Sequence, residues 1–75
     1  MIILYETEVC PYCQEAKEFL DEMGVSYNEV DVSKDEKAAK EMVEKSGQMG
    51  VPVLDIDGEI VIGFDKEKIS ELLGK

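Results

Sequence analysis

The chain alternates short apolar runs with segments in which apolar residues return every three or four positions. Residues 2–5 are apolar and rich in β-branched side chains, and the run is too short for a helix, so it predicts a buried strand. From Pro11 to Gly24 the spacing is helical, because proline suits a first helical turn and glycine the position after a helix. The expected apolar side consists of Ala16, Phe19, Leu20 and Met23. The charged residues between them, Lys17 included, are expected to face water.

The middle of the chain predicts a second strand and a second helix. Residues 27–32 alternate apolar and polar side chains, as a half-buried strand does. Ser33 and Glu36 have the spacing of a capping box, in which each side chain bonds to the other's backbone at a helix start. The helix is expected over residues 35–46, with Gly47 ending it. Its apolar stripe consists of Ala38, Ala39, Met42 and Val43.

The last third predicts a hairpin followed by a short helix. Asp57-Gly58 stands between two apolar runs, 53–56 and 59–62, and is a strong signal for a two-residue turn. Pro52 precedes the first of these strands, where a residue without an N–H is tolerated. Asp65 can cap the last helix. The apolar side of that helix consists of Ile69, Leu72 and Leu73.

The element order is therefore β-α-β-α-β-β-α. A strand–helix–strand unit implies a parallel pair, whereas the closing hairpin is antiparallel. We expect an α/β fold with a mixed, four-stranded sheet and three helices packed on it. With 75 residues and no linker or repeat, the chain is expected to form a single domain over residues 1–75.

The charge balance narrows the function classes. The net charge is −10, which argues against nucleic-acid binding and against docking on anionic membranes, since both need basic patches. It favours solubility and partners with basic docking faces. The apolar runs are far shorter than the roughly 20 residues needed to cross a bilayer, and the N-terminus lacks the pattern of a signal peptide. We therefore expect a cytoplasmic protein without membrane contact.

The two cysteines, Cys10 and Cys13, lie between the first strand and the first helix. This spacing and place are typical of a dithiol that cycles between thiol and disulfide. A structural disulfide is the first alternative, but so short a loop restricts the unfolded chain by only about 2 kcal/mol, against about 4.7 kcal/mol for a 100-residue loop. A metal site is the second alternative. Structural zinc takes four cysteine or histidine ligands, and because the chain has no histidine, a metal or cluster would need a second copy.

The helix start assigns different roles to the two thiols. Cys10 falls where unpaired N–H groups and the helix dipole favour a thiolate, so it is the expected nucleophile. Cys13 is one turn further on and is the expected resolving thiol. Glu6, Glu8 and Glu15 are near in sequence, and their like charge is expected to disfavour the thiolate.

Three segments together resemble the glutaredoxins: Cys10-Pro11-Tyr12-Cys13, Val51-Pro52 and Gly63-Phe64-Asp65. The resemblance spans nearly the whole chain and implies the thioredoxin fold for the element order above. It also implies a thiol–disulfide oxidoreductase that reduces protein disulfides and glutathione mixed disulfides by dithiol exchange. Glutathione would be the co-substrate, with no tightly bound cofactor and no metal, and the protein is expected to be a monomer.

The same resemblance implies a substrate site. Cys10 would attack, and Cys13 would resolve the mixed disulfide. The backbone of Val51, before a cis bond to Pro52, would pair with the cysteinyl part of glutathione. The γ-glutamyl carboxylate would bind the amides of Gly63, Phe64 and Asp65 at the start of the last helix. Tyr12 would place its ring at the mouth of the site; the alternative is an ordinary exposed turn residue.

Two positions depart from the family pattern and keep alternatives open. Many glutaredoxins have a lysine three residues before the first cysteine, where this chain has Thr7, and the family's double glycine is here Ile62-Gly63. Both changes favour a glutaredoxin-like redoxin that is reduced by thioredoxin reductase and supplies electrons to ribonucleotide reductase, whereas Pro11-Tyr12 favours a glutaredoxin. A third possibility, of another class, is a metal-binding or iron–sulfur-binding adaptor.

Overall fold

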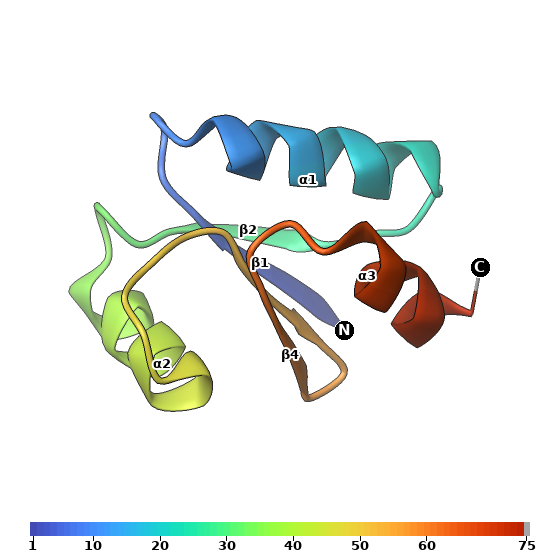
Figure 1. The fold of residues 1–75 in the computed structure, drawn as a ribbon. Coiled ribbons are helices and arrows are strands. Elements are labelled where there is room, and N and C mark those ends of the chain that lie inside the picture. The colour runs from blue at the N-terminus through green and yellow to red at the C-terminus, as the bar shows by residue number, and fades with distance from the viewer. Residues whose placement is uncertain (75) are drawn as a thin grey trace.

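Four strands form one mixed sheet in the order β2-β1-β3-β4, and three helices pack on it in the computed structural model, which describes residues 1–74 (Figure 1). The strands are β1 (Ile2–Glu6), β2 (Asn28–Asp31), β3 (Val53–Ile56) and β4 (Glu59–Ile62). The helices are α1 (Pro11–Glu22), α2 (Glu36–Ser46) and α3 (Lys66–Leu73). β1 pairs with β2 in parallel and with β3 antiparallel, and β3 pairs antiparallel with β4. The expected element order and mixed sheet are confirmed.

The helices divide between the two faces of the sheet. In Figure 1, α1 and α3 lie on one side of the strands and α2 lies on the other. Side chains alternate along each strand, so Leu4 and Leu54 pack with Leu20 and Ile69 on the first side, while Tyr5 and Val53 pack with α2 on the second. We call these the α1/α3 face and the α2 face.

The α1/α3 face holds the larger apolar cluster. Its buried members are Ile2, Leu4, Ala16, Leu20, Leu54, Ile56, Val61 and Ile69. The buried members of the cluster on the α2 face are Tyr5, Ala38, Met42 and Val53. Phe19, which was expected to be buried, is only half-buried because it lies at the edge of the first cluster.

The turns use the expected residues. Asp57 and Gly58 both have positive φ, 50° and 94°, as a two-residue turn that matches strand twist requires. Gly47 ends α2 in the left-handed conformation, with φ 76°. No helix among residues 1–74 has the length and apolar character that a membrane span requires.

The expected capping box is wrong. The hydroxyl and the amide of Ser33 both bond to the Asp31 carboxylate, at 2.5 and 2.9 Å, so Ser33 closes the turn after β2 instead of capping a helix. Asp35 is the N-cap of α2, since its carboxylate accepts the Ala38 N–H at 3.1 Å. Ser33 bonds to Asp31 and not to the backbone at the start of α2, because Asp31 lies only two residues away.

Candidate active site

The two thiols lie at the start of α1, as expected. Cys10 is the N-cap with extended backbone, φ −99° and ψ 109°, and its Sγ accepts the Cys13 N–H at 3.2 Å. Pro11 occupies the first helical position, where its missing N–H is no loss. Cys10 therefore fills the place that a serine or aspartate usually takes, and a thiolate there receives a backbone hydrogen bond and the helix dipole.

Cys13 lies one turn deeper. Its side chain is buried, with 1% of its surface exposed, whereas Cys10 is half-buried, and both cysteines are free thiols. Burial, and next the contact with the Cys10 sulfur, raises the pKa of the Cys13 thiol to about 12. The charge of Glu6 adds to this rise, and a backbone hydrogen bond from Thr7 opposes it. Cys13 is thus a protonated thiol in the reduced protein and can resolve a mixed disulfide only after losing a proton.

The acidic residues near the thiols repel a thiolate less than their sequence positions indicate, because two of them are ion-paired. Lys17 Nζ lies 2.6 Å from Glu6 Oε1 and 3.2 Å from Glu29 Oε1, so it is half-buried in an ion-pair network instead of facing water as expected. The hydrogen bond that Lys17 donates to Glu6 is the main cause of the raised pKa of Lys17. This contact neutralises the one glutamate that is buried beside the dithiol.

Glu8 is also paired, with Lys34 Nζ 2.5 Å from its Oε1. The sequence contained the signal for this contact. Glu8 follows β1 and Lys34 follows β2, and the carboxyl ends of parallel strands meet at one edge of a sheet. Of the three expected repulsive carboxylates, only Glu15 has no ion-pair partner among residues 1–74.

The two other segments of the family resemblance, Val51-Pro52 and Gly63-Phe64-Asp65, are joined by a hydrogen bond. The Val51–Pro52 peptide bond is cis, as expected, and Val51 is half-buried against the cluster on the α2 face. The Gly63 N–H donates to the Pro52 carbonyl at 2.9 Å. The expectation that Gly63 offers its amide to a carboxylate therefore needs correction. The Gly63 hydrogen bond instead holds the segment before α3 against Pro52. The φ of Gly63 is 77°, a positive value that glycine adopts readily.

The start of α3 leaves two backbone amides unpaired within the described residues. Asp65 is the N-cap, and its carboxylate accepts the Lys68 N–H at 3.2 Å. The amides of Phe64 and Asp65 donate to no protein acceptor within residues 1–74. The Phe64 ring packs on Phe19 of α1, with ring centroids 5.8 Å apart.

Tyr12 lies in the first turn of α1 with 63% of its surface exposed. Its hydroxyl makes no hydrogen bond in the part of the chain that the structure describes, so its place at the mouth of the site stays a prediction. The described residues contain no cluster of three or more Cys, Asp or Glu side chains arranged to hold a metal ion.

Comparison with known proteins gives one family. The model of the family described as Glutaredoxin matches residues 2–61, which ends just before Gly63. An uncharacterised glutaredoxin-like 8.6 kDa protein in the rubredoxin operon of Clostridium pasteurianum is 43% identical over 75 residues, which is 100% of both chains. Glutaredoxin 3 of Escherichia coli K12 is 37% identical over 62 residues, 83% of this chain and 75% of that protein. A crystal structure of the thioredoxin-like protein BC3987 is 39% identical, with a TM-score of 0.90 over 96% of this chain and 99% of that one.

Proposed function

This chain belongs to the glutaredoxin family, and from that premise we propose that it is a thiol–disulfide oxidoreductase that acts by dithiol exchange. One observation carries the proposal. The Cys10 sulfur accepts a backbone N–H at the start of a helix, at 3.2 Å, while Cys13 is buried directly behind it as a free thiol. A stabilised nucleophile and a protected second thiol are what two-step disulfide reduction needs.

The first step is attack by the Cys10 thiolate on one sulfur of a target disulfide. The target S–S bond breaks, a Cys10 mixed disulfide forms, and the other target sulfur leaves as a thiolate that takes a proton from water. Forming the mixed disulfide also neutralises the Cys10 sulfur and weakens it as a hydrogen-bond acceptor, and so reduces two of the causes that raise the pKa of Cys13. Cys13 then loses its proton more readily.

In the second step Cys13 attacks the Cys10 sulfur. The mixed disulfide breaks, the Cys10–Cys13 disulfide forms, and the target is released with both sulfurs reduced. Two electrons have passed from the dithiol to the target, and a reductant must return them. Because the cycle starts from two free thiols, it suits a reducing compartment, and we propose that the protein works in the cytoplasm.

We propose glutathione as the reductant to test first. Its γ-glutamyl carboxylate would meet the two amides without protein acceptors, those of Phe64 and Asp65, with the Lys66 ammonium one residue further on. A first glutathione thiolate would attack the Cys10 sulfur of the Cys10–Cys13 disulfide, so that this bond breaks, Cys13 becomes a thiol again and Cys10 forms a mixed disulfide with glutathione. A second glutathione would then cleave that mixed disulfide, giving glutathione disulfide and the reduced dithiol.

A second candidate is a redoxin reduced by a protein reductase and serving ribonucleotide reductase. Two observations favour it. Thr7 supplies no positive charge beside the thiols, and the Gly63 amide already serves the Pro52 carbonyl. Both would weaken the binding of a small peptide through its carboxylates, whereas a protein reductase can use a larger contact area.

The choice of reductant separates the two candidates. Oxidised protein would be supplied either with glutathione and glutathione reductase or with thioredoxin reductase, and the loss of NADPH would be followed in the presence of a small disulfide substrate. Turnover with glutathione alone is the expected result. Turnover with thioredoxin reductase alone would favour the redoxin. No turnover with either reductant, or turnover that Cys10→Ser leaves undiminished, would refute the oxidoreductase.

A further inference from the structure

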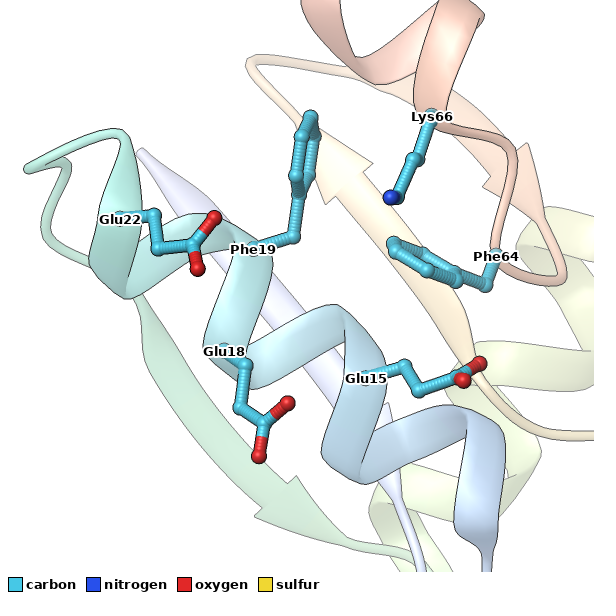
Figure 2. A pocket seen from close by; sticks show the side chains of 6 residues that line it. All are labelled: Glu15, Glu18, Phe19, Glu22, Phe64 and Lys66. Atoms are coloured by element: carbon cyan, nitrogen blue, oxygen red, sulfur yellow. The ribbon is translucent and has the colours of Figure 1, made fainter.

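An open hollow of about 170 Å³ lies between α1 and the start of α3, and it begins two residues after Cys13 (Figure 2). Two aromatic rings, three carboxylates and one ammonium line it. These residues are Glu15, Glu18, Phe19, Glu22, Phe64 and Lys66. The dithiol exchange described above uses none of the three carboxylates, so the composition of the hollow calls for a separate explanation.

The rings of the hollow already hold a cation. Phe19 and Phe64 meet edge to face at an interplanar angle of 70°. The Lys66 ammonium lies 5.6 Å from the centroid of the Phe19 ring and 5.7 Å from that of Phe64. Figure 2 shows the Lys66 side chain between the two rings. A cation within about 6 Å of a ring centroid is attracted by the ring's quadrupole, so this ring pair is a cation site filled by a flexible side chain of the protein itself.

The carboxylates leave the hollow with excess negative charge. Glu15, Glu18 and Glu22 follow one another at three and four residues along α1, a spacing that puts them on one side of the helix. None of them has an ion-pair partner among residues 1–74, whereas Glu6 and Glu8 are both paired. Like charges at this spacing slightly destabilise a helix, so an external cation would relieve a repulsion that the fold leaves in place.

We propose that this hollow binds an arginine or lysine side chain of the protein whose disulfide Cys10 attacks. The proposal rests on the proposed oxidoreductase function, because it concerns how that enzyme recognises its partner. Charge complementarity selects a basic segment, and a planar guanidinium, which stacks on aromatic rings, suits the site better than an ammonium. The incoming cation takes the place of the Lys66 ammonium over the rings.

The helix geometry also fixes where the basic residue stands. Phe19 is nine residues after Cys10, and at 1.5 Å per residue this is about 13 Å along α1. An extended peptide covers that distance with about four residues. The preferred partner therefore has a basic residue about four positions from the cysteine that Cys10 attacks.

The test uses synthetic peptides and needs no reductant. Each peptide has one cysteine in a mixed disulfide with thionitrobenzoate, and four positions away it has either arginine or glutamine. Pre-reduced protein attacks the disulfide in a single turnover, and the released coloured thiolate gives the rate constant. At low salt the arginine peptide is expected to react about tenfold faster than the glutamine peptide, with the ratio shrinking as salt is added.

Two triple variants separate the hollow from net charge. Glu15→Gln/Glu18→Gln/Glu22→Gln is expected to lower the ratio to about twofold or less. Its matched control is Glu41→Gln/Glu44→Gln/Glu59→Gln, which removes three exposed carboxylates outside the hollow and is expected to keep the wild-type ratio. Lys66→Gln, which vacates the ring pair, is expected to raise the ratio about two- to threefold.

The peptide rates distinguish a failure of the docking site from a failure of the oxidoreductase function. A wild-type ratio near one, or an equal fall in both triple variants, would overturn the docking site, since the second result would mean that only overall charge matters. If no peptide reacts at all, the oxidoreductase function fails instead. Docking is then measured by binding of a cysteine-free arginine peptide to Cys10→Ser protein, followed through the NMR signals of the Phe19 and Phe64 rings. Unchanged ring signals at saturating peptide would refute it.

Discussion

On each face of the sheet, one strand carboxylate is buried and a lysine from the covering helix neutralises it. On the α1/α3 face Lys17 Nζ lies 2.6 Å from Glu6 Oε1, and on the α2 face Lys45 Nζ lies 2.8 Å from Asp55 Oδ2. Glu6 is 7% exposed and Asp55 is 9% exposed, and no other charged residue among the described ones is so buried. An unpaired carboxylate would be costly in either place, so both lysines support the fold.

The surroundings of the two pairs differ. Lys45 also donates to the Tyr5 hydroxyl at 2.9 Å, and Asp55 accepts the Gly58 N–H at 2.8 Å, so this pair ties α2 to the hairpin turn. The other pair lies beside the dithiol, since Lys17 is one turn after Cys13 and the charge of Glu6 acts on the Cys13 thiol. A buried lysine–carboxylate pair therefore stabilises the fold on the α2 face, and on the α1/α3 face such a pair also influences the redox chemistry.

A change at Cys10 is expected to alter turnover far more than it alters the stability of the fold. Cys10→Ser removes the nucleophile, so turnover should fall more than about 10³-fold. Serine is a favoured N-cap and can accept the Cys13 N–H in place of sulfur, so the free energy of unfolding should change little. Steady-state turnover and urea unfolding of the same preparation measure both quantities. A variant that unfolds at much lower urea would mean that the Cys10 sulfur has a structural role that serine cannot fill.

On the α2 face the opposite result is expected. Lys45→Met leaves Asp55 buried without its ion pair and the Tyr5 hydroxyl without a partner, so the free energy of unfolding should fall by about 1–3 kcal/mol. The lower part of that range allows for the one-third exposure of the Lys45 side chain. Turnover per folded molecule should stay as in the wild type, because this pair lies on the face away from α1. Urea unfolding, with turnover measured well below the transition, checks both statements.

The corresponding change beside the thiols, Lys17→Met, is expected to affect both stability and redox chemistry. Lys17→Met leaves the charge of Glu6 unneutralised, and that charge already raises the pKa of Cys13. The pKa of Cys13 should rise further, so the step in which Cys13 resolves the mixed disulfide should slow about three- to tenfold at pH 8. Stopped-flow release of the second target thiol isolates this step. If Lys17→Met and Lys45→Met lose only stability, the two pairs are equivalent and the comparison fails.

Local signals predicted most of the fold. The hairpin at Asp57-Gly58, the glycine after α2 and the proline at the start of α1 each depend on the conformation of one or two residues, which the residue type restricts strongly. The thiol positions followed from the same local reasoning, because the cysteine spacing and the helix start are both visible in the sequence. The capping box failed since two local partners, Asp31 and Glu36, competed for Ser33.

Contacts between distant residues were not predictable in the same way. Lys17 was expected to face water because helical periodicity assigns a charged residue to the polar side, yet Glu6 lies 11 positions earlier and only the placement of α1 over β1 brings the two together. Lys45 and Tyr5 are 40 positions apart. The hollow at Phe19 and Phe64 likewise needs α3 to be placed against α1. Pairing of this kind depends on the tertiary arrangement of the elements.

Acid should weaken the Asp55 pair. The hydrogen bond from Lys45 holds the pKa of Asp55 below its ordinary range, so the folded protein binds this proton less readily than the unfolded chain. The stability that the pair contributes is therefore present above about pH 4 and is lost as the pH falls through the lower, folded value. Asp55→Asn lacks this group, so the gap in unfolding free energy between wild type and variant should narrow between pH 7 and pH 3. Urea midpoints at four or five pH values measure the gap, and a constant gap would contradict the assignment.

The smallest effect is expected at the outer end of the Lys17 network. Glu29 is about half exposed, and its Oε1 lies 3.2 Å from Lys17 Nζ, against 2.6 Å for the buried Glu6. An ion pair with an exposed partner contributes about 0.2–1 kcal/mol, and salt screens it. Glu29→Gln should therefore cost less than 1 kcal/mol, with the difference from wild type vanishing in about 1 M salt, where the screening length falls to about 3 Å. It should leave the resolving step unchanged, since Lys17 still neutralises Glu6. A slower resolving step in Glu29→Gln would mean that the whole network, and not the buried pair alone, sets the charge that Cys13 experiences.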